Sequence, residues 1–202
     1  MRSRWLGTLA LAVVAAVVLS SQQASAADWS ANFNLQSGRR SADASDWKPV
    51  DHTSCAGIEA TWGPSDEELM VATDLYYANG DKTLPSVIGP VKTEVKVWEL
   101  AIGLRKVWVA KWLRPYAGAG VSLLRDELEV SKPGRLTRSG TDIGTCLWVG
   151  GGVYARLLKH LDLGIYARYT PANHIRVLHD SIDGSSGMVG IGLGWGWGEK
   201  QK

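Results

Sequence analysis

The last part of the chain alternates between glycine and large apolar residues. It reads GMVGIGLGWGWG over residues 187–198, so one set of alternate positions is nearly bare and the other is apolar. Successive side chains of a β-strand point to opposite faces, so a period of two predicts a strand with one apolar face and one almost empty face. Any fold for this chain must give these two faces different surroundings.

The same period of two occurs in seven earlier segments, which predicts eight strands. These segments are residues 28–36, 55–62, 69–77, 97–105, 115–124, 146–157 and 161–169. The connections alternate between short turns near 63–67, 107–111 and 159–160 and longer polar stretches at 37–52, 79–91, 125–141 and 171–186. An even number of strands with short turns on one side and long loops on the other is typical of an outer-membrane barrel.

The less apolar face indicates which side of the sheet meets lipid. It carries glycine, tyrosine and charged residues of both signs. A buried charge needs a partner, and charges of both signs can pair inside the narrow interior of an eight-stranded barrel. The apolar face then points into lipid, whereas a water-soluble barrel carrier with that face turned inward remains the alternative. The charged residues that we assign to the interior are Glu59, Asp74, Glu99, Arg105, Arg156, Asp162 and Arg168.

The positions of the tryptophans favour the lipid-facing arrangement. If the chain enters the barrel from the periplasm, six of them fall at the periplasmic ends of strands, where aromatic girdles form at the membrane interface. We therefore predict an all-β fold, an eight-stranded antiparallel up-and-down transmembrane β-barrel. The predicted girdle consists of Trp29, Trp62, Trp108, Trp112, Trp195 and Trp197.

The beginning of the chain has the features of a secretory signal peptide. Arg2 and Arg4 precede an apolar run over residues 5–19, and Ala24-Ser25-Ala26 supplies a small-residue cleavage site. We expect residues 1–26 to be the signal peptide and residues 27–202 to be the barrel domain. Without the two arginines the chain has equal numbers of basic and acidic residues, so its charge gives no reason to expect nucleic acid as a partner.

Two stretches carry a resemblance to a known group of proteins. LRPYAGAGV at 113–121 and LDLGIYARY at 161–169 resemble the fifth and seventh strands of the small eight-stranded outer-membrane β-barrel proteins of Gram-negative bacteria, the opacity-protein and OmpA-like barrel group. The resemblance covers residues 28–197. It implies a location in the bacterial outer membrane, contact with outer-membrane lipid and lipopolysaccharide, insertion by the barrel-assembly machinery, and a monomer.

The resemblance leaves three kinds of function open. Our first expectation is a non-enzymatic surface or envelope-integrity protein with long extracellular loops. The alternatives are a narrow pore for small solutes, gated by interior charge pairs, and a lipid A-modifying hydrolase. For the hydrolase, the sequence His179-Asp180-Ser181 faintly resembles the arrangement in lipid A deacylase barrels, where serine is the nucleophile and histidine the base.

We expect neither a metal site nor a cofactor. The four histidines and the two cysteines show no spacing typical of metal ligands. Cys55 and Cys146 are expected to face the interior near the outer rim as free thiols, because their strands lie across the barrel from each other.

Overall fold

The computed structural model describes residues 29–42, 47–65, 67–86, 89–132, 137–171, 174–177, 180–183 and 185–197, with the backbone alone described at 138, 174–177 and 180–183. The predicted signal peptide lies outside these residues. Within them, no helix is long and apolar enough to cross a membrane. The strands are β1 Trp29–Ala42, β2 His52–Pro64, β3 Leu69–Leu84, β4 Val91–Val107, β5 Leu113–Ser131, β6 Arg138–Arg156, β7 Leu161–Thr170, β8 His174–Val177, β9 Asp180–Asp183 and β10 Ser186–Trp197.

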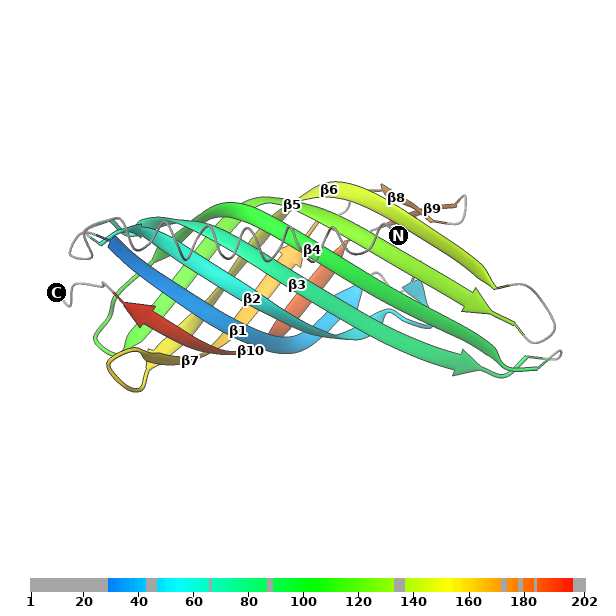
Figure 1. Cartoon of the computed structure of the whole chain (residues 1–202), viewed down its shortest axis with the longest axis horizontal. Helices are drawn as coiled ribbons and strands as arrows, with labels where there is room; N and C mark the ends of the chain where they lie inside the picture. The colour runs from blue at the N-terminus through cyan, green and yellow to red at the C-terminus, as the bar shows by residue number, and fades with distance from the viewer. Residues whose placement is uncertain are drawn as a thin grey trace, which may run out of the picture.

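Eight of these strands close into one antiparallel barrel, which confirms the predicted fold. The order around the barrel is β1-β10-β7-β6-β5-β4-β3-β2, and β1 closes the ring by pairing with β10. β8 and β9 form a separate hairpin in the connection between β7 and β10. Figure 1 shows the barrel strands running obliquely to the long axis of the molecule. We call the end with the short β2–β3, β4–β5 and β6–β7 connections the periplasmic end, as in outer-membrane barrels.

Several strands are longer than the sequence predicted. Residues 79–91 and 125–141 were expected to be loops, but β3 pairs with β4 out to Leu84, and β5 pairs with β6 out to Val130. The expected loop at 37–52 is also shorter, because β1 continues to Ala42. Beyond the membrane both faces of a sheet can meet water, so the apolar alternation stops while the backbone pairing continues. The connection at 171–186 contains the β8–β9 hairpin, which we did not predict.

The long strands form a sheet that extends past the rest of the barrel at its outer end, on the right in Figure 1. Its outermost part consists of residues 80–84, 91–95, 128–131 and 138–140, and we call this part the protruding sheet. Its base is marked by four residues that are cross-strand neighbours in consecutive strands, namely Gly80, Val95, Leu128 and Gly140.

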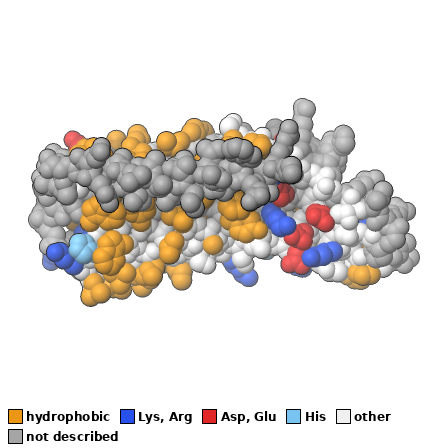
Figure 2. Space-filling model, viewed as in Figure 1, with side chains coloured by type: hydrophobic (Ala, Val, Ile, Leu, Met, Phe, Trp, Pro, Cys, Tyr) orange, Lys and Arg blue, Asp and Glu red, His pale blue; other side chains and the backbone are white. Residues whose placement is uncertain are grey.

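The outside of the barrel carries an apolar belt. Figure 2 shows hydrophobic side chains over the middle and left of the molecule, with one group of charged side chains toward the protruding end and a smaller one at the left end. A continuous apolar surface of this kind marks contact with lipid or with another apolar surface. Its members include Leu35, Ile58, Leu100, Ile102, Leu104, Val121, Leu123, Leu147, Leu163, Ile165, Val189, Ile191 and Leu193.

The barrel interior is built from large aromatic residues that each lie opposite a glycine. Five inward-pointing aromatic residues have a glycine as their direct cross-strand partner, because a neighbouring Cβ would occupy the space of the ring. The glycine side of the alternation therefore makes room for rings inside a narrow barrel. The pairs are Tyr76 with Gly57, Tyr116 with Gly152, Trp148 with Gly120, Tyr154 with Gly164, and Tyr166 with Gly190.

The same geometry accounts for the glycines of β10. Gly190 lies opposite Tyr166 of β7, and a Cβ on it would come within 2.7 Å of the ring. Gly194 and Gly196 lie opposite the inward-pointing amides Asn34 and Asn32 of β1. The bare face of the last strand thus faces the filled interior, and its apolar face belongs to the outer belt.

Candidate functional site

The candidate site is the barrel interior, whose centre holds a network of ion pairs. Asp74 of β3 is shared by two arginines. Its two oxygens each accept a hydrogen bond of 3.1 Å from Arg105 Nη2 of β4, and Oδ2 accepts one of 2.9 Å from Arg168 Nη1 of β7. Arg168 Nη2 also donates to Glu99 Oε1 at 2.6 Å. One carboxylate therefore links two guanidinium groups whose strands, β4 and β7, are separated by β5 and β6.

Glu59 of β2, the cross-strand partner of Asp74, extends this network. Arg105 Nη2 lies 3.2 Å from Glu59 Oε1, and Arg105 Nη1 donates to Thr61 at 2.7 Å. The hydroxyls of Tyr76 and Tyr154 donate to the same carboxylate at 2.6 and 2.7 Å. These charged side chains are all buried, so their hydrogen bonds replace the water that they lose.

Aromatic rings cover the two arginines. The guanidinium carbon of Arg168 lies 4.3 Å from the ring centre of Trp148 and 5.2 Å from that of Tyr76. Arg105 lies 4.9 Å from the ring centre of Tyr116. These cation–π contacts add to the ion pairs and hold both guanidinium groups in fixed orientations.

A smaller ion pair lies apart from the central network. Arg156 pairs with Asp162 at the periplasmic end of β6 and β7, with 2.8 Å between Nη2 and Oδ2, and Asn32 donates to the same carboxylate at 2.7 Å. The sequence placed Arg156 and the other charged residues in one interior set. Arg156 bonds to Asp162 of the neighbouring strand, at the periplasmic end of the set.

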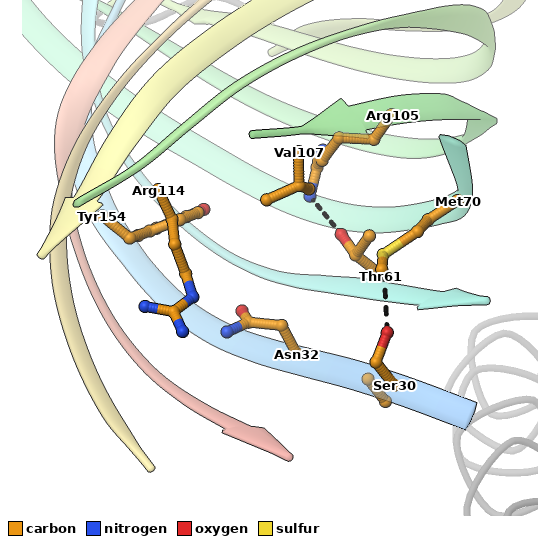
Figure 3. A pocket seen from close by; sticks show the side chains of 9 residues that line it. Ser30, Asn32, Thr61, Met70, Arg105, Val107, Arg114 and Tyr154 are labelled. Carbon is orange, nitrogen blue, oxygen red and sulfur yellow. Dashed lines mark hydrogen bonds between the residues drawn. The ribbon is translucent and has the colours of Figure 1, made fainter. Parts of the chain in front are cut away.

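The interior leaves little empty space. Figure 3 shows the periplasmic part of the lumen, where Ser30, Asn32, Thr61, Arg105, Arg114 and other side chains line a cavity of about 20 Å³. That volume has room for about one water molecule. Eight-stranded barrels have interiors that side chains just fill, and a cavity of this size agrees with that.

The outer end of the lumen is closed by residues that we did not identify from the sequence. Trp47 and Val50 of the β1–β2 connection are buried in the mouth, and the Arg40 guanidinium lies 5.7 Å from the Trp47 ring centre. Asp126 of β5 is also buried. The sequence did contain a signal for Arg40 and Asp126, because the period of two in β1 and β5 places both inside when it is continued beyond the apolar segments. No local pattern identifies Trp47.

The remaining predicted site residues occupy separate places. Glu59 and Glu99, assigned to the interior from the sequence, each pair with an arginine there. Cys55 is buried, Cys146 is half-buried, and they form no disulfide. The backbone of Ser181 lies in β9 opposite Arg176, while its side chain and the whole of His179 lie outside the described residues. The hydrolase site therefore stays a prediction.

The six tryptophans of the predicted girdle lie toward the periplasmic end. Trp197 of β10 and Trp62 of β2 are both cross-strand partners of Ala31 in β1, so they lie in the same row across three neighbouring strands. Trp108 and Trp112 are in the β4–β5 turn. At least 40% of the side chain is exposed in each of Trp29, Trp108, Trp112 and Trp195.

A closed antiparallel barrel with an apolar outside and paired charges inside defines an integral membrane β-barrel protein. The chain belongs to the family described as outer membrane protein beta-barrel domain, whose model matches residues 7–196. Its location is therefore the bacterial outer membrane. No curated protein matches the chain.

Solved structures with a similar fold include three outer-membrane or surface proteins. Neisserial surface protein A (NspA) is 18% identical with a TM-score of 0.53, covering 83% of this chain and 96% of that one. Ail, the attachment invasion locus protein of Yersinia pestis, is 13% identical with a TM-score of 0.55, covering 85% and 99%. A major outer membrane protein from Thermus thermophilus is 11% identical with a TM-score of 0.51, covering 84% and 99%. At these identities the likeness shows the fold alone.

Proposed function

We propose that this chain is a non-enzymatic surface protein of the outer membrane that attaches to partners through the protruding sheet. The observation that carries this proposal is strand length. A strand needs about 9–11 residues to cross a membrane, and β7 has 10 whereas β5 and β6 have 19 each. The extra residues add paired sheet beyond the apolar belt, and neither anchoring nor closing the barrel requires them.

The edges of the protruding sheet support binding by strand addition. β3 pairs with β2 only as far as Asn79, and β6 pairs with β7 only as far as Val149. Beyond these points, within the described residues, each strand has a backbone partner on one side only. β8 lies beside β6 without joining its sheet, so the β3 edge at residues 80–84 is the more open one. Unpaired backbone groups on an edge can pair with an extended segment of another chain.

The outward face near the protruding sheet is polar, which suits contact with water and a hydrated partner. Lys96 lies 2.9 Å from Glu94, Lys92 lies 3.4 Å from Glu94, and Arg125 lies 2.6 Å from Glu127. The hydrogen bonds from Lys96 and Lys92 lower the pKa of the Glu94 carboxyl below its ordinary value. Exposed pairs of this kind contribute little to stability, so they are free to exchange for contacts with a partner.

One of the proteins with a similar fold supports attachment. Ail is an attachment invasion locus protein, and one of its structures contains the heparin analogue sucrose octasulfate. Pairing of the interior charges and the Trp47 side chain buried in the outer mouth argue against the narrow pore.

A shortened variant tests this proposal. Gly80 and Val95 are cross-strand partners, as are Leu128 and Gly140, so each pair can be joined by Asn-Gly, which forms a two-residue hairpin turn. Bacteria that display the shortened barrel should lose attachment to host cells and matrix proteins that the full-length chain confers. A retained shift in gel mobility between unheated and boiled samples would show that the shortened barrel still folds.

Three results would overturn the proposal. Attachment that survives the shortening would remove the protruding sheet as the binding element. A change in the lipid A acyl pattern that disappears in Ser181→Ala would establish the hydrolase. Steady single-channel conductance in a planar bilayer would establish the pore.

A further inference from the structure

The outer mouth of the barrel is filled by a side chain from the chain's own β1–β2 connection. Trp47 is 2% exposed and Val50 is 4% exposed. The connection is held by hydrogen bonds of 2.8 Å from Val50 N–H to the Trp47 carbonyl and from Ala42 N–H to the Asp51 carbonyl. A large aromatic side chain therefore occupies the entrance to the lumen.

One side of this entrance is apolar. Trp47 and Val50 belong to a buried cluster with Val95 and Val97 of β4 and Leu124 of β5. Such a wall fits any flat apolar group of about the size of an indole ring, because apolar contact depends on shape and area more than on direction.

The other side of the entrance is a polar arc. Arg40 of β1 is the cross-strand partner of Thr53 of β2, and Ser186 of β10 is the partner of Thr170 of β7. β2, β1, β10 and β7 are consecutive around the barrel, so these four side chains share one wall. We call them the polar arc, and all four are at least 95% buried.

The polar arc contains buried side-chain atoms that lack hydrogen-bond partners. Among the described residues, no hydrogen-bond partner reaches Nε and Nη2 of Arg40 or the side-chain oxygens of Thr53, Thr170 and Ser186. Buried donors in folded proteins are nearly always bonded, and unbonded ones need an explanation. A guanidinium with hydroxyl groups on neighbouring strands forms a donor set suited to an anionic oxygen.

Asp126 completes the entrance from the β5 side. It is 1% exposed, and neither of its carboxylate oxygens has a hydrogen-bond partner among the described residues. A ligand that reaches across the mouth would meet donors on the polar arc and an acceptor at Asp126. This arrangement disfavours a second negative charge and favours a hydrogen-bond donor at the far side of the ligand.

We propose that the outer mouth is a binding site for small aromatic anions that carry one acidic group and one hydrogen-bond donor. In this structure Trp47 occupies the place of the aromatic body, and the polar arc supplies donors for the anionic group. Mouths of β-barrels are common ligand sites, and such sites combine an apolar lining with a few convergent polar groups. The proposal is independent of attachment by the protruding sheet.

The test uses the purified full-length barrel in detergent micelles, with indole-3-acetate as the probe and titration calorimetry as the measurement. Removing the ring in Trp47→Ala should lower the Kd for the probe by about tenfold or more, because the ligand no longer competes with a tethered side chain. Adding Arg40→Gln to that variant should raise the Kd by about tenfold or more, as expected for the loss of a hydrogen bond to a charged group. Uncharged indole should bind much more weakly than indole-3-acetate.

Arg39→Gln is the matched control, since Arg39 is the next residue of β1 and is exposed. In the Trp47→Ala background it should leave the Kd unchanged. If Arg40→Gln fails to show the heat-dependent gel shift of a folded barrel, Thr53→Val removes a hydroxyl of the arc at similar volume and should also weaken binding.

Several results would overturn the proposal. Absence of binding to Trp47→Ala would mean that water alone satisfies the polar arc. Equal affinity for indole and indole-3-acetate would remove the anion site. Equal losses from Arg39→Gln and Arg40→Gln would show that the probe partitions into the micelle surface.

Discussion

Replacing Gly190 by alanine should destabilise the barrel although it adds a single methyl group. The new Cβ would lie 2.8 Å from Gly38 Cα and 2.7 Å from a ring carbon of Tyr166, and closer still to the carbonyl oxygen of Ser37. Carbon atoms in contact are ordinarily about 3.5–4.0 Å apart. β1 and β10 would therefore have to separate by about 1 Å, which stretches their neighbouring hydrogen bonds. Overpacking of this kind costs about 1–3 kcal/mol of the free energy of unfolding.

Gly187 of the same strand supplies the matched control. A Cβ there meets only the carbonyl oxygen of Arg168, at 3.9 Å, which is ordinary contact. Because alanine restricts the unfolded chain more than glycine does, Gly187→Ala should stabilise the barrel by about 0.4–1 kcal/mol.

The two substitutions thus have opposite expected signs. Urea unfolding in lipid vesicles, followed by tryptophan fluorescence and by the heat-dependent gel shift, measures both. If Gly190→Ala unfolds at the same urea concentration as the unaltered protein, the close approach of β1 and β10 does not explain the glycines of the last strand.

Three further predictions concern the charges and the apolar belt. Asp74→Asn should lower the free energy of unfolding by about 3–5 kcal/mol, because it leaves two buried arginines without their shared partner, whereas the exposed Asp81→Asn should cost about 0–1 kcal/mol; urea unfolding measures both. In lipid vesicles Leu193→Arg should lower the free energy of unfolding by about 2–4 kcal/mol if Leu193 lies near the middle of the membrane. Leu84→Arg in the protruding sheet should change it by no more than about 0.5 kcal/mol. A larger loss from Leu84→Arg than from Leu193→Arg would contradict the assignment of the apolar belt to the membrane. Glu94 should titrate below the ordinary carboxyl pKa in a side-chain NMR experiment, so its stabilising contribution is present at neutral pH and is lost as the pH falls through that lowered pKa. In Lys96→Met the Glu94 midpoint should rise, and an unchanged midpoint would contradict the pairing.

The sequence contained enough to predict the architecture but not the length of its outer part. Alternation in segments such as 187–198 is a direct consequence of strand geometry with different surroundings on the two faces. Where both faces of a strand are exposed, as at residues 81–84, the pattern carries no such signal, and the pairing of Leu84 with Val91 becomes visible only in the folded barrel.

The particular partners inside the barrel required the tertiary structure. The sequence by itself determined the eight strands, the apolar and polar faces, and the presence of acids and arginines on the inner one, because these follow from local periodicity and charge. Only the closed barrel decided that Asp74 joins Arg105 to Arg168, that five inward rings on the strands lie opposite glycines, and that Trp47 fills the outer mouth. Those contacts join residues far apart in the chain, and strand register and ring closure bring them together.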